Sequence, residues 1–148
     1  MEKRVLGQKK TPISAIGYGA MSFSDFYGAT DDEKSFAILD RCMDLGITHI
    51  DTSNVYGMGI SETRIGAYLE KQGKQGQDFF TIATKAGITS GPDGSRHYDN
   101  SFAHLENELD KSLQRLGLDQ VELLYVHRRD ENTPIEEVAD NLGRLVKA

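Results

Sequence analysis

Strand-forming and helix-forming segments alternate four times along this 148-residue chain. Short apolar runs begin near residues 15, 47, 79 and 121, and each is followed by a segment whose apolar residues recur at helical spacing. Strands that alternate with helices at this spacing are joined by right-handed crossovers and form a parallel sheet. The sequence therefore predicts an α/β fold, and an open doubly wound sheet and a barrel both share this pattern.

Local signals place the individual elements. Residues 5–6 and 12–16 are expected to form a β-hairpin around the polar turn 7–10, ahead of the repeating units. The four strands are expected at residues 16–18, 47–50, 79–84 and 121–126. The predicted helix N-caps are Thr30, Ser61, Ser101 and Thr133, and the predicted helix ends are Gly46, Lys71, Gly117 and the terminal Ala148. Residues 72–77 are expected to form a turn, and residues 87–100 a polar loop centred on residues 91–94.

Charge and composition narrow the class of ligand. The net charge is −6, and no basic run exceeds a pair such as Lys9-Lys10, which argues against a nucleic-acid partner. No segment is apolar enough for a signal sequence or for a membrane span, so we expect a soluble, cytoplasmic protein. The single Cys42 lies on the apolar face of a predicted helix and is interpreted as a buried thiol, which excludes a disulfide and a cysteine-based metal site.

Polar residues end three successive predicted strands. These are Asp51, Lys85 and His127, and Tyr56 lies on the loop five residues after Asp51. Taken singly, each has an ordinary structural interpretation as a cap, a rim residue or a strand-end polar group. In a parallel barrel, however, side chains at the carboxyl ends of neighbouring strands converge on one mouth. The combination therefore predicts a catalytic cluster.

The four residue types suit proton transfer to an oxygen. A nearby ammonium stabilises the phenolate form of a tyrosine, so a Tyr-Lys pair can donate a proton near neutral pH. A carboxylate would hold the lysine charged, and an imidazole could hydrogen-bond the substrate oxygen. Other chemistry is disfavoured: residues 17–22 lack the third glycine of a dinucleotide fingerprint, Ser53 lacks the G-x-S-x-G turn of a nucleophile, and no histidines have zinc-ligand spacing.

Residues 51–62, 83–87, 124–130 and 133–137 are similar to successive signatures of the aldo-keto reductase family. The resemblance implies a (β/α)8 barrel that binds NADPH (NADP+) without a Rossmann domain and reduces the carbonyl of a small aldehyde or ketone. It implies Tyr56 as proton donor, Lys85 as the group that makes Tyr56 a better acid, Asp51 as the partner of Lys85, and His127 as the residue that orients the carbonyl. It also implies that Ala20, Met21 and Asp51 lie beside the cofactor.

The length departs from the family pattern, because a complete barrel needs roughly 250 residues. We therefore expect residues 1–148 to be one incomplete domain, the N-terminal half of a barrel with four βα units and exposed sheet edges. Such a half barrel is expected to associate with itself or with a complementary half, and to show little or no reductase activity alone. The alternative function is a non-catalytic regulatory subunit on the same scaffold, like the potassium-channel β subunits.

Three aromatic residues follow the first predicted strand. Phe23, Phe26 and Tyr27 could either line the substrate site or pack the loop against the rim.

Overall fold

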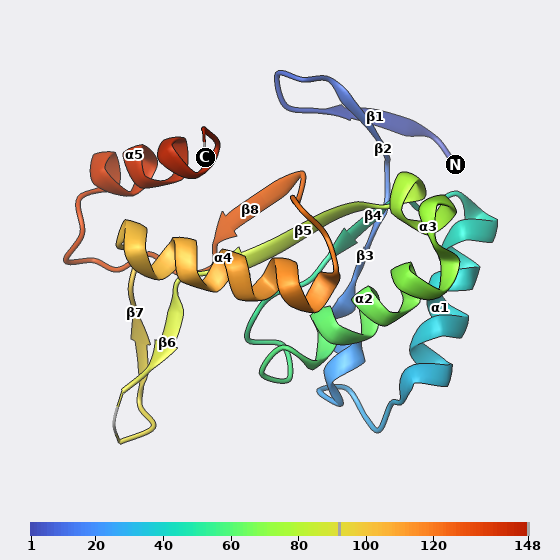
Figure 1. The fold of residues 1–148 in the computed structure, drawn as a ribbon, viewed down its shortest axis with the longest axis horizontal. Helices are drawn as coiled ribbons and strands as arrows, with labels where there is room; N and C mark the ends of the chain where they lie inside the picture. Colours follow the sequence, from blue (N-terminus) through green and yellow to red (C-terminus); the bar gives the residue numbers. More distant parts are fainter. Residues whose placement is uncertain (92, 148) are drawn as a thin grey trace.

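The fold is known from a computed structural model that describes residues 1–91 and 93–147. Four parallel strands form its central sheet (Figure 1). In order across the sheet they are β3 (Gly17–Gly19), β4 (His49–Asp51), β5 (Thr81–Ala86) and β8 (Leu123–Val126). Among these four strands, each one neighbours the strand that precedes it in the chain, so every crossover steps in the same direction. A doubly wound sheet would reverse its strand order at a switch point, and the observed order is that of a barrel wall.

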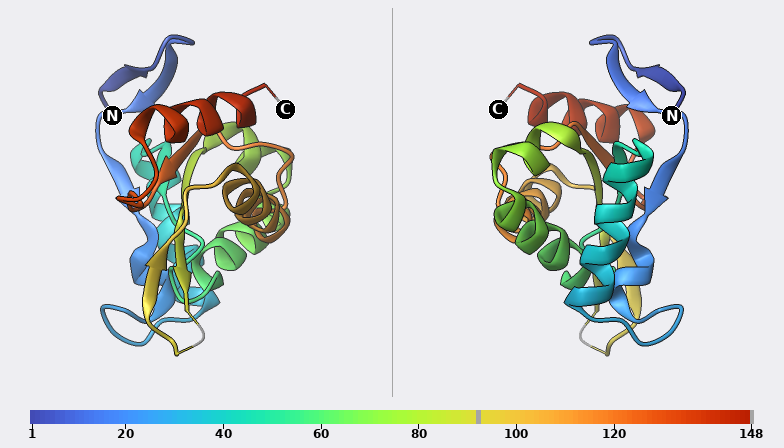
Figure 2. Two further views of the ribbon diagram at one scale, coloured as in Figure 1. Left: turned by 90° about the vertical axis from the view of Figure 1, so that its left-hand side faces the viewer. Right: turned by 90° about the vertical axis from the view of Figure 1, so that its right-hand side faces the viewer.

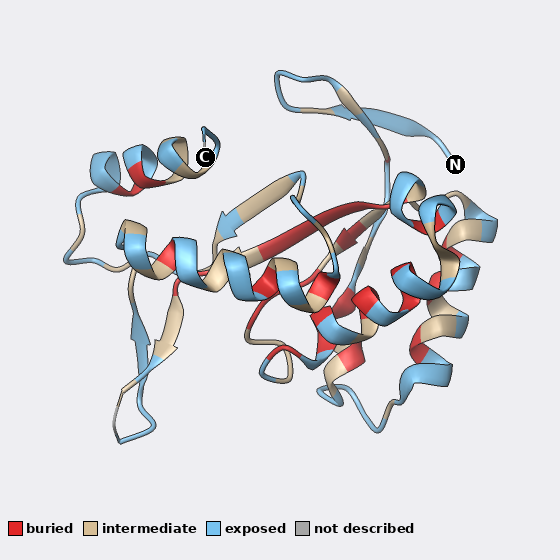
Figure 3. Cartoon of the chain, viewed as in Figure 1, coloured by how far each residue is buried: buried red, intermediate tan, exposed pale blue. Residues whose placement is uncertain are grey.

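Three long helices follow the first three strands and supply most of the core. They are α1 (Asp32–Leu45), α2 (Ile60–Gln72) and α4 (Phe102–Leu116). In the side views of Figure 2, α2 and α4 lie on the same side of the strands. Their apolar faces meet the sheet in one buried cluster that includes Leu39, Ile50, Ile65, Tyr68, Ile82 and Leu116. Figure 3 shows this burial concentrated along the central strands and the facing sides of the helices. Cys42 belongs to the same cluster, which confirms the prediction of a buried thiol.

Two β-hairpins flank the sheet at opposite ends. The first, β1 (Lys3–Leu6) with β2 (Thr11–Ser14), confirms the predicted N-terminal hairpin. Ser14 and Thr48 exchange two hydrogen bonds of 2.9 Å between backbone nitrogens and side-chain oxygens, and these fasten the hairpin beside the start of β4. The second, β6 (Ile88–Ser90) with β7 (Arg96–Tyr98), occupies the segment predicted as a polar loop. Pro92, at the centre of the predicted turn, lies outside the described residues.

Three of the four predicted N-caps are wrong, those of α1, α2 and the last helix, because other groups satisfy the helix ends. At α1 the cap is Asp31, whose carboxylate accepts from the backbone nitrogen of Lys34, so the helix begins one residue after the predicted position. At α2 the cap is Gly59, without a side-chain hydrogen bond. Ser61, predicted as this cap, is buried inside the helix and donates instead to the backbone oxygen of Ala20 at 2.8 Å. Gly46 ends α1 in a left-handed conformation as predicted.

Of the other predicted helix boundaries, some are confirmed and some are wrong. Ser101 caps α4 through the backbone nitrogen of His104 and Gly117 ends it, as predicted. The predicted turn at residues 72–77 is replaced by a short helix, α3 (Lys74–Phe79), which continues almost directly from α2. The last helix, α5 (Ile135–Leu145), has Pro134 rather than Thr133 as N-cap, because the Thr133 hydroxyl donates to Asp130. It ends at Leu145, short of the predicted end at Ala148, which is outside the described residues. Within the part of the chain that is described, no helix is long and apolar enough to cross a membrane.

Candidate active site

Strand register brings the three strand-end residues onto one face. Asp51 is in register with Ala83, and Lys85 is in register with Tyr125. Lys85 therefore lies two residues beyond the level of Asp51, and His127 lies two residues beyond the level of Lys85. Side chains along a strand alternate between faces with a period of two, so a stagger of two residues per step keeps all three on the same face. This parity confirms that the strand ends converge.

The chain after β4 continues to pair with β5 beyond the formal end of the strand. The backbone nitrogen of Thr52 donates to Ala83 and that of Asn54 donates to Lys85, at 2.8 and 3.3 Å. These bonds hold residues 52–54 in a buried, fixed path. The following turn places Tyr56, whose backbone nitrogen donates to Ser53 at 3.2 Å. The loop residue of the cluster is thereby positioned by the sheet itself.

The ammonium of Lys85 is the centre of the cluster. Its side chain is 13% exposed and donates to the carboxylate of Asp51 at 2.5 Å, to the backbone oxygen of Thr52 at 2.7 Å and to the phenol oxygen of Tyr56 at 3.1 Å. Three acceptors saturate the three hydrogens of an ammonium group. The ammonium of Lys85 is therefore held against the phenol oxygen, a placement that suits the stabilisation of a negative charge on that oxygen.

His127 completes the tetrad (Asp51, Tyr56, Lys85, His127). Its ring meets that of Tyr56 edge-on, with 5.8 Å between centroids. Burial lowers the pKa of His127 below its usual 6.5, and the positive charges of Lys85 and Arg128 lower it further. The imidazole is therefore neutral at pH 7 and can act as a hydrogen-bond donor beside the phenol without adding a second positive charge.

The two remaining predicted site residues lie at the same end of the sheet. Ala20 and Met21 follow β3, whose last residue, Gly19, is in register with Asp51. Ala20 is 0% exposed, and its backbone oxygen is already bound by Ser61, while Met21 is partly exposed. Met21 thus keeps a surface that a ligand could touch, and Ala20 does not.

The three aromatic residues after β3 differ in how far they are buried. Phe23 is 0% exposed and packs in the core, so it supports the rim. Phe26 and Tyr27 are 65% and 74% exposed, and their rings stack edge-on with 5.0 Å between centroids. The alternative in which the residues pack the loop against the rim therefore holds for Phe23, because the short helix at Ala20–Ser24 turns it inward, whereas Phe26 and Tyr27 stay exposed.

Two polar residues beside the tetrad are Ser53, which the sequence suggests only as a nucleophile that is then rejected, and Asn54, which the sequence does not single out. The hydroxyl of Ser53 lies 3.0 Å from Nδ1 of His127, and the amide of Asn54 donates to Glu108 at 2.8 Å. The only signal for Ser53 is its position two residues after Asp51, which continues the same alternation of faces. Since Ser53 is 0% exposed, it cannot attack a substrate, in agreement with the rejection of a serine nucleophile.

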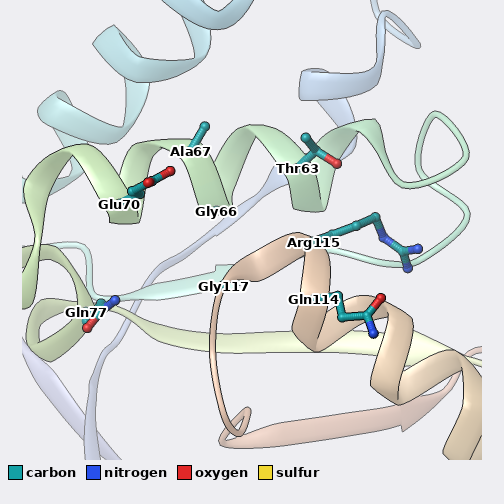
Figure 4. Close-up of a pocket in the computed structure, with 8 residues that line it drawn as sticks. All are labelled: Thr63, Gly66, Ala67, Glu70, Gln77, Gln114, Arg115 and Gly117. Atoms are coloured by element: carbon teal, nitrogen blue, oxygen red, sulfur yellow. The ribbon is translucent and has the colours of Figure 1, made fainter.

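A hollow of about 510 Å³ lies elsewhere, between α2 and α4. Figure 4 shows Gly66 of α2 and Arg115 of α4 among the residues that line it. No tetrad residue is part of this lining. Within the described residues, no group of three or more histidine, cysteine or acidic side chains is placed to hold a metal ion.

Comparison with known proteins shows the family to which the chain belongs. Residues 15–148 match the sequence profile of the Aldo/keto reductase family. The chain belongs to the aldo/keto reductase family. Its described fold is the corresponding part of the barrel of that family, with four parallel strands and their helices.

Individual aldo/keto reductases are similar over nearly the whole of this chain. The NADP(+) aldo-keto reductase yakc of Schizosaccharomyces pombe is 38% identical over 98% of the chain, and the L-glyceraldehyde 3-phosphate reductase of Escherichia coli is 37% identical over 100%. The holo form of the aldo-keto reductase AKR11C1 from Bacillus halodurans superimposes with a TM-score of 0.83, at 30% identity and over 99% of the chain. The chain spans 42% of the length of these two curated relatives and 47% of that structure.

Proposed function

We propose that this aldo/keto reductase chain carries the proton-donating half of an NADPH-dependent reduction of aldehyde or ketone carbonyls to alcohols. The observation that carries the proposal is the 3.1 Å hydrogen bond from the Lys85 ammonium to the Tyr56 phenol oxygen. A buried, charge-assisted contact to a phenol has an evident use in proton donation. A regulatory subunit would need only a binding surface, so this contact favours an enzyme over the regulatory alternative.

Each tetrad residue has a separate part in the proposed reaction. Tyr56 gives its proton to the carbonyl oxygen, and Lys85 stabilises the phenolate that remains. Asp51 accepts from Lys85 and keeps the ammonium charged and oriented. His127 donates a hydrogen bond to the same carbonyl oxygen and fixes its direction relative to the phenol. Tyr56 and His127 act on one oxygen of the substrate, and Lys85 and Asp51 act through Tyr56, which fits the convergence of the four residues on one face of the sheet.

The tetrad supplies a proton but no hydride, because no protein side chain donates hydride. A bound nicotinamide supplies the hydride to the carbonyl carbon in this class of reaction. The donor set therefore fits NADPH as cofactor, and the similarity to an NADP(+) aldo-keto reductase and to a holo structure supports this assignment. We propose that Asp51 and the exposed part of Met21 lie beside the nicotinamide, and that Ala20 supports the same loop from behind.

The two edge strands of the sheet indicate where a partner chain would pair. Within the described residues, β3 and β8 each pair with a single strand of the sheet. Ile16 and Tyr125, beside and on these edge strands, are 60% and 41% exposed. We propose that a complementary set of strands, from a second copy or from a chain with the rest of the relatives' length, pairs with these edges. Light scattering of the 148-residue chain should then give a defined dimer or a defined mixed complex, and a monodisperse monomer in every mixture would contradict the proposal.

The function is tested by joining residues 1–148 to the remaining C-terminal part of the Escherichia coli relative. NADPH consumption with small aldehydes is then followed for this chimera, for its Tyr56→Phe variant and for the 148-residue chain alone. We expect turnover from the chimera, loss of at least roughly 100-fold in Tyr56→Phe, and little turnover from the 148 residues alone. A chimera that folds and binds NADPH but turns over equally well with Phe at position 56 would refute the proposed role of Tyr56.

A further inference from the structure

A buried serine touches the imidazole of the tetrad. Ser53 is 0% exposed, and its hydroxyl oxygen lies 3.0 Å from Nδ1 of His127. Neither residue is free to move away, because residues 52–54 pair with β5 and the backbone nitrogen of His127 donates to Ala86 at 2.7 Å. The contact is thus fixed by two strands on either side of β5.

The neighbours of Ser53 limit where its hydrogen can point. The amide nitrogen of Asn54 donates to Glu108 at 2.8 Å, and Glu108 also accepts from Lys111 at 2.8 Å. Since a carboxylate only accepts, the amide oxygen of Asn54 is the atom that faces Ser53, at 3.3 Å. The backbone nitrogen of Val55 donates to the Ser53 oxygen at 3.4 Å. The hydroxyl hydrogen therefore has two acceptors to choose from, Nδ1 of His127 at 3.0 Å and Asn54 at 3.3 Å.

The acceptor that the Ser53 hydroxyl takes decides which nitrogen of His127 carries the ring hydrogen. Burial, Lys85 and Arg128 lower the pKa of His127, Arg96 lowers it slightly, and Asp51 opposes these charges, so the ring is neutral at pH 7 and carries one hydrogen. Nε2 has no hydrogen bond to the described residues and is absent from their buried unpartnered atoms, so solvent reaches it. Nε2 is thus the nitrogen available to a ligand.

We propose that Ser53 is a positioning residue that donates its hydroxyl hydrogen to Nδ1 of His127 and so keeps the imidazole hydrogen on Nε2. The distance from the Ser53 oxygen to Nδ1 is 3.0 Å, shorter than the 3.3 Å to the competing amide oxygen of Asn54, and this supports donation to Nδ1. In the reverse arrangement Ser53 would donate to Asn54, Nδ1 would donate to Ser53, and Nε2 would present a lone pair. The use of this hydrogen rests on the proposed function, in which His127 donates to the carbonyl oxygen. Only the Nε2–H form can make that donation.

The test reads the tautomer directly and needs no activity. Nitrogen-15 NMR of the labelled 148-residue chain at pH 7.5 reports which imidazole nitrogen of His127 is protonated, with the His127→Gln variant identifying its signals. We expect the Nε2–H form in the unsubstituted chain. In Ser53→Ala, the ratio of Nε2–H to Nδ1–H should fall about five-fold, the effect of one neutral hydrogen bond. Ser53→Thr retains the hydroxyl and should preserve the ratio.

Ser35→Ala is the matched control, because Ser35 is also 0% exposed but donates to the backbone oxygen of Asp31, the N-cap of α1. It should leave the His127 signals unchanged. An Nδ1–H form in the unsubstituted chain would overturn the proposal, and this result does not depend on whether any variant folds. An unchanged ratio in folded Ser53→Ala would overturn it as well. If the tautomer responds as expected but the chimera reduces no carbonyl, the proposed function fails and the assignment of Ser53 stands.

Discussion

The ammonium of Lys85 and the phenol of Tyr56 are joined by a 3.1 Å hydrogen bond although 29 positions separate them in the chain. The same ammonium also lies 4.8 Å from the centroid of the tyrosine ring. The position of Lys85 is fixed by β5 and that of Tyr56 by the turn that follows β4. A change in either residue should therefore alter the proposed proton donation with little effect on the fold.

Lys85→Met is expected to abolish the activity of the chimera. The substitution removes the positive charge that stabilises the phenolate, and it leaves Asp51 without its ammonium partner. We expect kcat to fall by at least roughly 100-fold, with a much smaller change in NADPH affinity. Stopped-flow turnover and fluorescence titration with NADPH measure the two quantities separately. Equal losses in both would indicate that Lys85 mainly holds the cofactor.

The stability of the chain should depend on His127 as pH falls. Because the pKa of His127 is lower in the folded chain than its usual 6.5, the unfolded chain binds this proton first. The free energy of unfolding is then fully retained above about pH 6.5 and decreases as pH falls below that value. We expect His127→Gln to remove part of this decrease between pH 7.5 and pH 5.5, by less than ~1 kcal/mol because the ring is only half-buried. Urea unfolding at both pH values measures it, with the exposed His97→Gln as control.

Two helical glycines should respond in opposite directions to alanine. A Cβ at Gly66 of α2 would lie 2.1 Å from the backbone oxygen of Arg115, so α2 and α4 would have to separate. We expect Gly66→Ala to lower the free energy of unfolding by about 2–3 kcal/mol. A Cβ at Gly143 of α5 meets nothing within 4 Å, and Gly143→Ala should raise it by roughly 0.5–1 kcal/mol. Thermal unfolding compares the pair, and similar losses in both would contradict the close approach of α2 and α4.

The cap of α1 can be assigned by substitution. Asp31 accepts from the backbone nitrogen of Lys34 at 2.8 Å, whereas Thr30 precedes the helix. Asp31→Ala should lower the free energy of unfolding by about 1 kcal/mol. Thr30→Ala should change it by less than about 0.5 kcal/mol. The reverse order in urea unfolding would restore the cap that the sequence predicted.

A buried ion pair joins α2 to α4. Glu62 is 0% exposed and pairs with Arg115 at 2.7 Å, and it accepts from Thr84 at 2.5 Å. Arg115→Met leaves a buried carboxylate without its counter-charge and should cost about 3–5 kcal/mol. Adding Glu62→Gln should recover part of this loss, because a neutral amide is less costly to bury. A double-mutant cycle measures the coupling, and additive losses would show that the pair is not the origin of the effect.

The parts of the structure that were predicted correctly rest on signals within a few residues. Ser101 and Gly117 bound α4 as expected, because a hydroxyl cap and a left-handed glycine act on their own helix. Ser61 was mispredicted because its hydroxyl bonds to Ala20, 41 positions away, and no local pattern indicates that. The segment after β5 reads as a polar loop, yet it forms a hairpin through the pairing of β6 with β7.

The sequence by itself determined the order of the four parallel strands and of the helices that follow them, the polar residues at the strand ends and the family. These properties follow from periodicity, capping and motif spacing, which are carried by neighbouring residues. Only the tertiary structure decided that Ser53 faces His127, that Phe23 leaves the mouth while Phe26 and Tyr27 stay exposed, and that Glu62 is buried against Arg115. Each of these depends on strand register or on how closely two helices approach, and both are set by contacts between residues that are far apart in the chain.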